Sequence, residues 1–401
     1  MGMPSVRDLF GLSAYGGAAL SPSGRYVAVI AAINGERALV VLDLKARKIS
    51  VDKPLYGGDV TWVAWQTDER LIFGLGDLQA VAGEYPTVGG LVAVNRDGSD
   101  ERDFPYVQQV LRVVPGSTRF LSGGRDVILV DSARPHRERL SWPNPGHIVR
   151  WVIDFDGVPR AAVQADVDDD RSAWYVRKSA NDPWVEVEHA KLGRLDSEPM
   201  AFDPSGRFLY ASARRNGEDR AAIYEYHIAS GTWKGPVVRH PVRDIDAADA
   251  VFVSDYAKRK LLGLRYADDR PAVVWFDPEW ARIQKSVDAA LPNTVNAIYH
   301  ASDKWLIVAF SDRDPGEVYL LDGKTMKLEK LFSYRPWIDP KAMAPMRWVR
   351  YKTRDGMTIP ALLTVPLDAN RKPLPLIVDI HGGPIVPAED WGYRADVQFF
   401  A

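Results

Sequence analysis

The sequence predicts a mostly β fold: a seven-bladed β-propeller followed by the truncated start of a second, α/β domain. Two observations support this prediction. One strand-and-turn pattern returns seven times, and the character of the sequence changes after Leu331. A period of about 45 residues is typical of four-stranded propeller blades. We expect an N-terminal segment at 1–18, the propeller at 19–335, a linker at 336–347 and the start of the second domain at 348–401.

Each repeat consists of an apolar strand, a polar turn with Gly or Asp, a second strand and a hairpin. In "RYVAVIAA" and "RFLYASA" bulky apolar residues alternate with smaller or polar ones, the period expected of strands. The turns "SPSG" and "DPSG" contain a Gly for positive φ and a Pro that fixes the bend. A β-sandwich is the alternative, but sandwiches seldom repeat one pattern at near-constant spacing. The repeats span residues 19–50, 60–99, 110–132, 148–187, 199–233, 250–279 and 297–331.

Composition excludes several classes of protein. The chain has 401 residues, 46% hydrophobic and 26% charged, as in ordinary globular proteins. Its net charge of −2 gives no reason to expect nucleic acid or an anionic membrane as a partner. The N-terminus has no apolar signal-peptide region, and no stretch is apolar for long enough to span a membrane. We expect a cytoplasmic protein, or a periplasmic or secreted one if a leader has been removed, and the sequence leaves a homo-oligomer open.

Few residues are arranged for metal binding or nucleophilic catalysis. There are no cysteines, so disulfides, thiolate metal sites and a Cys nucleophile are excluded. "DVDDDR" at 166–171 begins like a calcium loop, but Arg171 occupies the position that needs Gly, so we expect a hairpin tip. The seven histidines show no paired ligand spacing, and no metal is predicted. "GLSAY" at 11–15 approaches G-x-S-x-G but ends in Tyr15 and follows no strand.

The last part of the chain has a different order of elements. After an aperiodic, Pro-rich stretch, residues 348–366 predict a hairpin with an Asp355-Gly356 turn. "LPLIVDI" at 374–380 is a continuous apolar run, which predicts a strand buried on both faces. Residues 389–401 predict the start of an amphipathic helix, with apolar side chains at Trp391, Val397, Phe400 and Ala401. Hairpin, buried strand, turn and helix is the order in which an α/β-hydrolase core begins.

"HGGP" at His381–Pro384 directly follows the predicted buried strand. Two glycines without Cβ atoms let backbone N–H groups approach a ligand oxygen closely. Such donors can stabilise the oxyanion of an acyl-transfer intermediate, and HGGG-type turns do so in hydrolases. The alternative is an ordinary Gly-rich strand exit in which His381 has a structural role.

These residues resemble the prolyl oligopeptidase family of serine peptidases, in particular the acylaminoacyl-peptidase and dipeptidyl-aminopeptidase type. The resemblance covers nearly the whole chain and is strongest in "YADDRPAVVWFDPEW" (266–280), "SDRDPGEVYLLD" (311–322), "RDGMTIPALLTVP" (354–366), "PLPLIVDIHGGP" (373–384) and "WGYRADVQFFA" (391–401).

The resemblance implies a propeller that restricts access to a hydrolase domain, so that short peptides react and folded proteins do not. It also implies that Gly383 offers its N–H to the oxyanion, that Gly382 allows the tight turn and that His381 holds the loop. The family's nucleophile in G-x-S-x-G-G, with its Asp and His, has no counterpart in this chain. The resemblance therefore implies a Ser-His-Asp triad beyond residue 401, an inactive isolated chain and no cofactor.

Three arginines are candidates for substrate recognition. Arg313, within "SDRDPG", could bind a peptide carboxylate or carbonyl, although an Asp-Arg-Asp cluster is more often a mutually paired turn. Arg265 and Arg270 are weaker candidates for the same role.

Two other functions stay open. A free-standing propeller could bind protein partners, and the oxyanion turn also fits an esterase or lipase. An interaction propeller has no use for a buried hydrolase strand, and lipases normally lack a seven-bladed N-terminal domain. If the apolar run at 374–380 cannot be covered, we expect a segment sensitive to proteases after about residue 345.

Overall fold

The computed structural model describes residues 4–53, 59–76, 90–107, 109–134, 136–141, 143–367, 374–380 and 391–401. These residues form two compact units. We call unit 1 the residues Met1–Val63, Asp268–Ala272 and Arg282–Ala401, and unit 2 the residues Ala64–Ala267 and Val273–Ala281.

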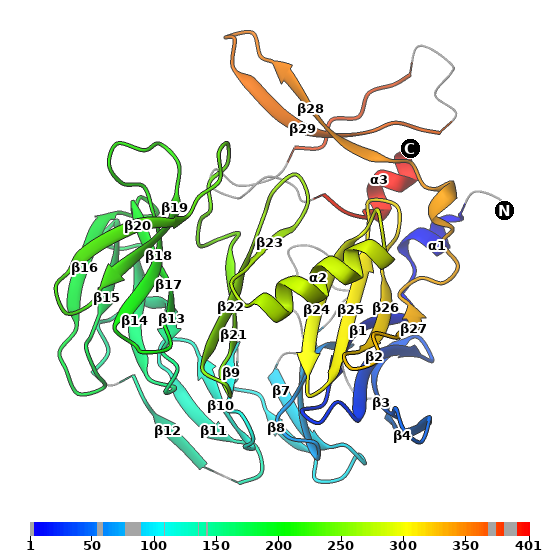
Figure 1. Ribbon diagram of the computed structural model, residues 1–401, viewed down its shortest axis with the longest axis horizontal. Coiled ribbons are helices and arrows are strands. Elements are labelled where there is room, and N and C mark those ends of the chain that lie inside the picture. Colours follow the sequence, from blue (N-terminus) through cyan, green and yellow to red (C-terminus); the bar gives the residue numbers. More distant parts are fainter. Residues whose placement is uncertain are drawn as a thin grey trace. The chain divides into compact units, whose positions relative to one another are not determined.

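Each of the seven sequence repeats forms one antiparallel sheet whose strands follow chain order (Figure 1). Sheet 6 has three strands and the other six sheets have four. This is the predicted mostly β fold with a seven-bladed propeller. Sheets 1 to 3 contain β1 (Tyr15–Leu20), β2 (Tyr26–Ile33), β3 (Glu36–Asp43), β4 (Lys48–Lys53), β5 (Asp59–Trp65), β6 (Arg70–Gly76), β7 (Gly90–Asn95), β8 (Arg102–Phe104), β9 (Gln109–Val113), β10 (Arg119–Gly123), β11 (Ile128–Asp131) and β12 (His136–Arg139).

Sheets 4 to 7 complete the repeats. They contain β13 (Ile148–Ile153), β14 (Pro159–Asp166), β15 (Arg171–Val176), β16 (Val185–Lys191), β17 (Ser197–Phe202), β18 (Phe208–Ala213), β19 (Ala222–His227), β20 (Thr232–Val238), β21 (Val251–Asp255), β22 (Lys260–Tyr266), β23 (Ala272–Trp275), β24 (Val295–Ala301), β25 (Lys304–Phe310), β26 (Glu317–Asp322) and β27 (Leu328–Ser333). The "DVDDDR" stretch forms the tip of the β14–β15 hairpin, as expected.

The turns between first and second strands have the conformation that the sequence predicted. Gly24 has φ +71° and Gly206 has φ +68°, values that favour glycine. In the second of these turns the Gly206 N–H donates to the Asp203 carbonyl at 2.9 Å, and the Asp203 carboxylate accepts the Phe208 N–H at 2.7 Å. The Asp side chain therefore fixes the point where β18 begins.

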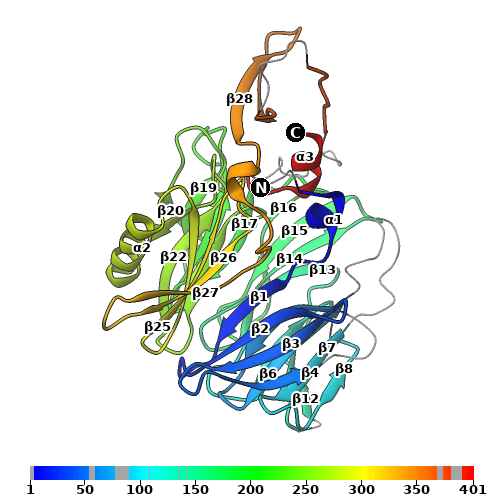
Figure 2. The same ribbon diagram turned by 90° about the vertical axis from the view of Figure 1, so that its right-hand side faces the viewer.

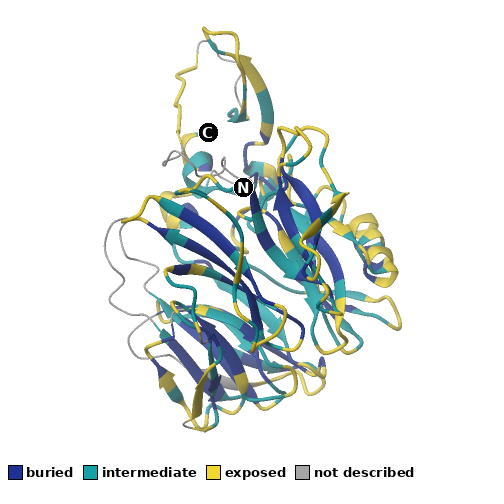
Figure 3. Ribbon diagram, turned by 90° about the vertical axis from the view of Figure 1, so that its left-hand side faces the viewer, coloured by how far each residue is buried: buried dark blue, intermediate teal, exposed yellow. Residues whose placement is uncertain are grey.

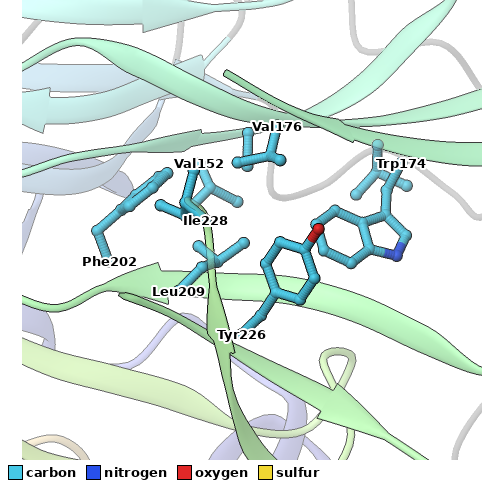
Figure 4. Close-up of a cluster of buried hydrophobic side chains, with 9 residues drawn as sticks. Val152, Trp174, Val176, Phe202, Leu209, Tyr226 and Ile228 are labelled. Atoms are coloured by element: carbon cyan, nitrogen blue, oxygen red, sulfur yellow. The ribbon is translucent and has the colours of Figure 1, made fainter. Parts of the chain in front are cut away.

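In unit 2 the hydrophobic core lies between neighbouring sheets, and the strand interiors are more buried than their tips (Figure 3). One cluster of nine buried residues joins sheets 4 and 5 (Figure 4). Its centre is Trp174, fully buried, whose ring lies edge-on to Tyr226 at 5.5 Å. The Trp174 indole N–H donates to the Ser197 hydroxyl at 3.1 Å, so its polar atom is satisfied as well. Similar clusters join sheets 2 and 3, 3 and 4, and 5 and 6.

A buried polar cluster also joins sheets 2 and 3. The Arg70 guanidinium, 2% exposed, donates to the Ser132 carbonyl at 2.7 Å and to the Asn95 side-chain oxygen at 3.0 Å. It pairs with Asp100 at 3.1 Å, so the buried charge is compensated.

In unit 1 the first and last sheets lie side by side. The Tyr15 ring lies 4.4 Å from the Phe332 ring, centroid to centroid, and the Tyr15 N–H donates to the Tyr334 carbonyl at 3.4 Å. An ion pair joins Arg47 to Glu329 at 3.2 Å. The first repeat therefore contacts the last, as expected of a propeller.

The helices are short and few in the described part of the chain: α1 (Val6–Phe10), α2 (Pro278–Ala290), the 3-10 helix η1 (Pro340–Ala342) and α3 (Ala395–Phe400). Helix α2 was not predicted. It begins at the end of the sixth repeat and buries Trp280, Ile283 and Val287. The spacing of these three residues matches one helix face, so the signal was present in the sequence.

The predicted hairpin after the linker is confirmed as β28 (Met346–Lys352) and β29 (Thr358–Thr364), with Gly356 at φ +88° in its turn. The predicted buried strand at 374–380 is wrong for this structure. These residues form no strand and are exposed, Ile380 by 80%, because no described strand pairs with them.

The helix predicted near the end of the chain is present as α3, but its buried face was predicted incorrectly. Trp391, just before it, is buried as expected, whereas Phe400 is exposed and Gln398 is buried instead. The reason is a set of hydrogen bonds to the backbone. The Gln398 amide accepts the Ala344 N–H at 2.8 Å and donates to the carbonyls of Ala344 at 2.9 Å and Asp312 at 3.3 Å.

The N-terminal helix and the C-terminal helix contact each other (Figure 2). Leu9 of α1 is buried against Ile338 and Met343 of the linker. The Phe10 and Phe399 rings lie 5.7 Å apart. The Asp8 carbonyl accepts a hydrogen bond from the Trp337 indole at 2.9 Å. The two ends of the chain are therefore packed together on the linker.

We expect Trp174→Ala to lower the free energy of unfolding by about 3–5 kcal/mol, because it leaves a large cavity between sheets 4 and 5. Urea-induced unfolding followed by circular dichroism would measure the change. The matched control is Trp62→Ala on β5, where the side chain is 38% exposed and little should change. Equal losses in the two variants would contradict this view of the core.

We expect Gln398→Ala to make residues 346–401 more sensitive to limited proteolysis than they are in the wild type. The substitution leaves the buried Ala344 N–H and C=O without partners, at about 1–3 kcal/mol per group. Mass spectrometry of the fragments would locate the cuts. Arg347→Ala, which changes an exposed side chain in β28, should leave the cleavage rate unaltered. A Gln398→Ala variant as resistant as the wild type would show that these hydrogen bonds do not hold the segment.

Candidate functional site

The predicted oxyanion residues His381, Gly382 and Gly383 lie outside the described residues. The segment before them, 374–380, is exposed and irregular, and the segment after them begins with the buried Trp391. The Trp391 indole N–H donates to the Met346 carbonyl at 3.4 Å, at the start of β28. The roles of the three residues stay predictions.

The "SDRDPG" stretch is the loop between β25 and β26 of the last sheet, and it contacts the start of β28. The Asp312 carboxylate, buried, accepts the Met346 N–H at 2.7 Å. Asp314 accepts the Gly316 N–H at 2.9 Å, and burial raises the pKa of Asp314. Both carboxylates accept hydrogen bonds from backbone N–H groups, a structural role that the sequence analysis did not predict.

Arg313, between these two acidic residues, is exposed. Among the described residues no carboxylate forms an ion pair with its guanidinium, so the mutually paired turn considered from the sequence does not form there. Its guanidinium is therefore accessible to a ligand.

The other two candidate arginines have different surroundings. Arg270 is exposed, and its guanidinium carbon lies 4.4 Å from the centroid of the Trp391 ring, a cation–π contact. Arg265 is half-buried on β22 of unit 2, where it lies opposite Val251 of β21. Arg270 and Arg313 belong to unit 1, whereas Arg265 belongs to unit 2.

Unit 2 contains a small pocket that the sequence did not indicate. It has a volume of about 130 Å³ and is lined by strand residues and loops of sheets 3 to 6. The Arg112 guanidinium lies over the Tyr256 ring, 3.6 Å from its centroid, and donates to the Ile153 carbonyl at 2.8 Å. Burial lowers the pKa of Arg112, and its Nε has no hydrogen-bond partner among the described residues. In the sequence, the only indication that Arg112 has a special environment was its position as a single charged residue within the apolar stretch "VLRVV".

Unit 1 contains a larger pocket of about 350 Å³, lined by residues from the start of the chain, β3, the region after β27 and the region before α3. Arg37 and Arg335 both line it. Sequence reasoning did not find this pocket, because its residues are far apart in the chain.

No group of three or more His, Cys, Asp or Glu side chains in the described part of the chain could hold a metal ion. Of the helices described above, none is long and apolar enough to cross a membrane.

Comparison with known proteins gives one curated relative and many similar structures. The chain is 26% identical over 423 aligned residues to dipeptidyl aminopeptidase BIII of Pseudoxanthomonas mexicana, covering 99% of this chain and 59% of that protein. The chain therefore spans less than two thirds of the length of this relative. No protein-family model matches the chain.

The solved structures have the same fold at low sequence identity. A crystal structure of puromycin hydrolase matches with a TM-score of 0.59 and 16% identity, covering 99% of this chain and 67% of that one. A structure from a study of two prolyl endopeptidases matches with a TM-score of 0.53 and 14% identity, covering 91% of this chain and 55% of that one.

These findings bear on the resemblance that the motifs indicated. The curated relative matches along almost the whole chain, and the seven sheets follow the fold of peptidases with an N-terminal seven-bladed propeller. The resemblance to the prolyl oligopeptidase family of serine peptidases, of the dipeptidyl-aminopeptidase type, is thereby confirmed.

Proposed function

We propose that this chain is the N-terminal part of a serine peptidase that releases aminoacyl, acylaminoacyl or dipeptidyl groups from short peptides. The observation that carries the proposal is the match of 99% of the chain to a dipeptidyl aminopeptidase. The predicted oxyanion turn, which follows the β28–β29 hairpin in the chain, is the feature that supports hydrolase chemistry.

In this proposal the reaction is acyl transfer. A Ser hydroxyl attacks the peptide carbonyl while a His takes the hydroxyl proton and an Asp orients the His. The His then gives this proton to the leaving amine as the peptide C–N bond breaks, and water hydrolyses the resulting acyl-enzyme. These three residues would belong to sequence beyond residue 401, since the 401 residues contain no G-x-S-x-G. Gly383 would donate its N–H to the oxyanion, Gly382 would allow the turn and His381 would hold the loop. No cofactor is required.

The propeller would restrict access and help to recognise the peptide. Arg313 is the best placed of the three candidate arginines, because its guanidinium is exposed and forms no ion pair with a described residue. Arg270, stacked on Trp391, and Arg265, on β22, would have secondary roles. A guanidinium binds a peptide carbonyl or carboxylate through charge-assisted hydrogen bonds.

We further propose the domain boundaries given by the sequence, with the propeller at 19–335, the linker at 336–347 and the hydrolase part from 348. A cytoplasmic location is proposed, with the periplasm or secretion as the alternative.

The test compares the protein encoded by the complete gene with the 401-residue chain. We expect the complete protein to react with a fluorophosphonate probe for active serines and to hydrolyse aminoacyl or dipeptidyl chromogenic substrates. The 401-residue chain should do neither, because it lacks the triad. A complete protein that is not labelled, or one that hydrolyses esters but no peptide substrate, would contradict the proposal.

We expect Gly383→Ala to lower kcat of the complete protein by about 100-fold, because an added Cβ displaces the N–H that binds the oxyanion. KM should change little, since the donor acts mainly in the transition state. The control is Gly392→Ala, where nothing lies within 4 Å of the position a Cβ would occupy. An unchanged kcat in Gly383→Ala would remove Gly383 from the oxyanion site.

A further inference from the structure

The pocket of unit 1 is lined by two arginines, and the carboxylate whose charge acts on Arg37 is that of Asp59, which accepts the Arg37 backbone N–H at 3.1 Å. Arg37 lies on β3 and Arg335 follows β27, and both are half-buried. Neither forms an ion pair with a described carboxylate. Charges taken out of water are normally paired, so two such cations beside one pocket need an explanation.

Arg37 is held in place by neutral groups. Its Nη2 donates to the Ser13 hydroxyl at 2.9 Å, and Nη1 lies against Gly16, in the space that a Cβ there would occupy. Its buried Nε has no hydrogen-bond partner in the described residues. Burial lowers the pKa of Arg37, an effect that the charge of Asp59 opposes only in part. The guanidinium is therefore fixed in position, and one of its N–H groups is left without a hydrogen bond among the described residues.

Arg335 lies close enough to Arg37 for the two charges to repel. Its Nη1 donates to the Asp8 carbonyl at 3.1 Å, again a neutral partner. Burial lowers the pKa of Arg335, the nearby Tyr393 side chain raises it, and the positive charge of Arg37 lowers it by a smaller amount. An anion between the two guanidinium groups would remove this repulsion.

A third donor lines the same pocket. The Tyr393 hydroxyl is buried and has no hydrogen-bond partner among the described residues. Tyr334 forms part of the wall, and burial raises its pKa to about 12, so it stays neutral at physiological pH. The pocket therefore combines two fixed cations, an unused hydroxyl and an uncharged aromatic wall.

We propose that Arg37, Arg335 and Tyr393 form a binding site for a small carboxylate, such as the free C-terminus of a short peptide. Guanidinium groups bind carboxylates through paired, charge-assisted hydrogen bonds, and the Tyr393 hydroxyl supplies a further donor. The volume of about 350 Å³ is within the range of small-ligand pockets. This site uses only residues of the present chain and does not depend on the peptidase activity.

The test measures the melting temperature and calorimetric binding of the 401-residue chain with acetate, glycylglycine and glycylglycinamide at constant ionic strength. We expect saturable binding of the two carboxylates and none of the amide, which lacks the negative terminus. Tighter binding of glycylglycine than of acetate would identify a peptide terminus as the ligand, and equal binding would identify recognition of the carboxylate alone. Both results support the site.

Two variants separate binding from folding. Arg335→Gln should weaken carboxylate binding at least 10-fold. Tyr393→Phe should weaken it several-fold without lowering the melting temperature of the unliganded protein, because the hydroxyl that it removes has no partner there. Arg194→Gln, which removes an exposed arginine of unit 2, is the matched control and should bind as the wild type does. The proposal is overturned if no carboxylate binds saturably, if the amide binds equally well, or if Arg335→Gln and Tyr393→Phe both bind as the wild type does.

Discussion

The structure depends on one constraint: a four-stranded sheet cannot bury its apolar faces alone. Each sheet of unit 2 shares a cluster of side chains with the next, so the core is divided among the spaces between sheets. Trp174 fills such a space, and its indole N–H finds a partner across it in Ser197. Stability in such an array comes from contacts between neighbours, which explains why one pattern is repeated along the sequence.

The same constraint applies at the ends of the chain. In unit 1 the first and last sheets contact each other, while α1 and α3 pack on the linker. The apolar cluster beneath the two helices has only three buried residues, and hydrogen bonds from polar side chains add to it. Asp312 and Gln398 bind the backbone of Ala344 and Met346, the residues that lead into the β28–β29 hairpin. A buried carboxylate or amide that satisfies backbone groups specifies position more strictly than apolar contact does, since a displaced partner leaves a buried group unpaired.

Much of the fold could be predicted from the sequence, because strand alternation and Gly-containing turns are local signals. Gly24 and Gly206 have the positive φ that their turns required, and the hairpin around Gly356 formed as expected. Helix α2 was missed although Trp280, Ile283 and Val287 have helical spacing, because the repeat pattern dominated that stretch. Local pattern cannot show which distant residues meet. Arg37 and Arg335 line one pocket from opposite ends of the chain, and Gln398 is buried only because Ala344 and Asp312 present backbone groups to it.

The apolar run at 374–380 links the folding of this segment to the chemistry proposed for the protein. A central strand of an α/β sheet needs partners at both edges and cover on both faces. Leu376, Ile377, Val378 and Ile380 have neither among the described residues and are exposed. Each of these side chains, when left in water, loses about 1.5–3 kcal/mol of the stabilisation that burial would provide. An oxyanion donor is effective only when it is held in place before the reaction. Gly383 follows this run by only a few residues, so the partners that would bury the strand are also those that would position the donor.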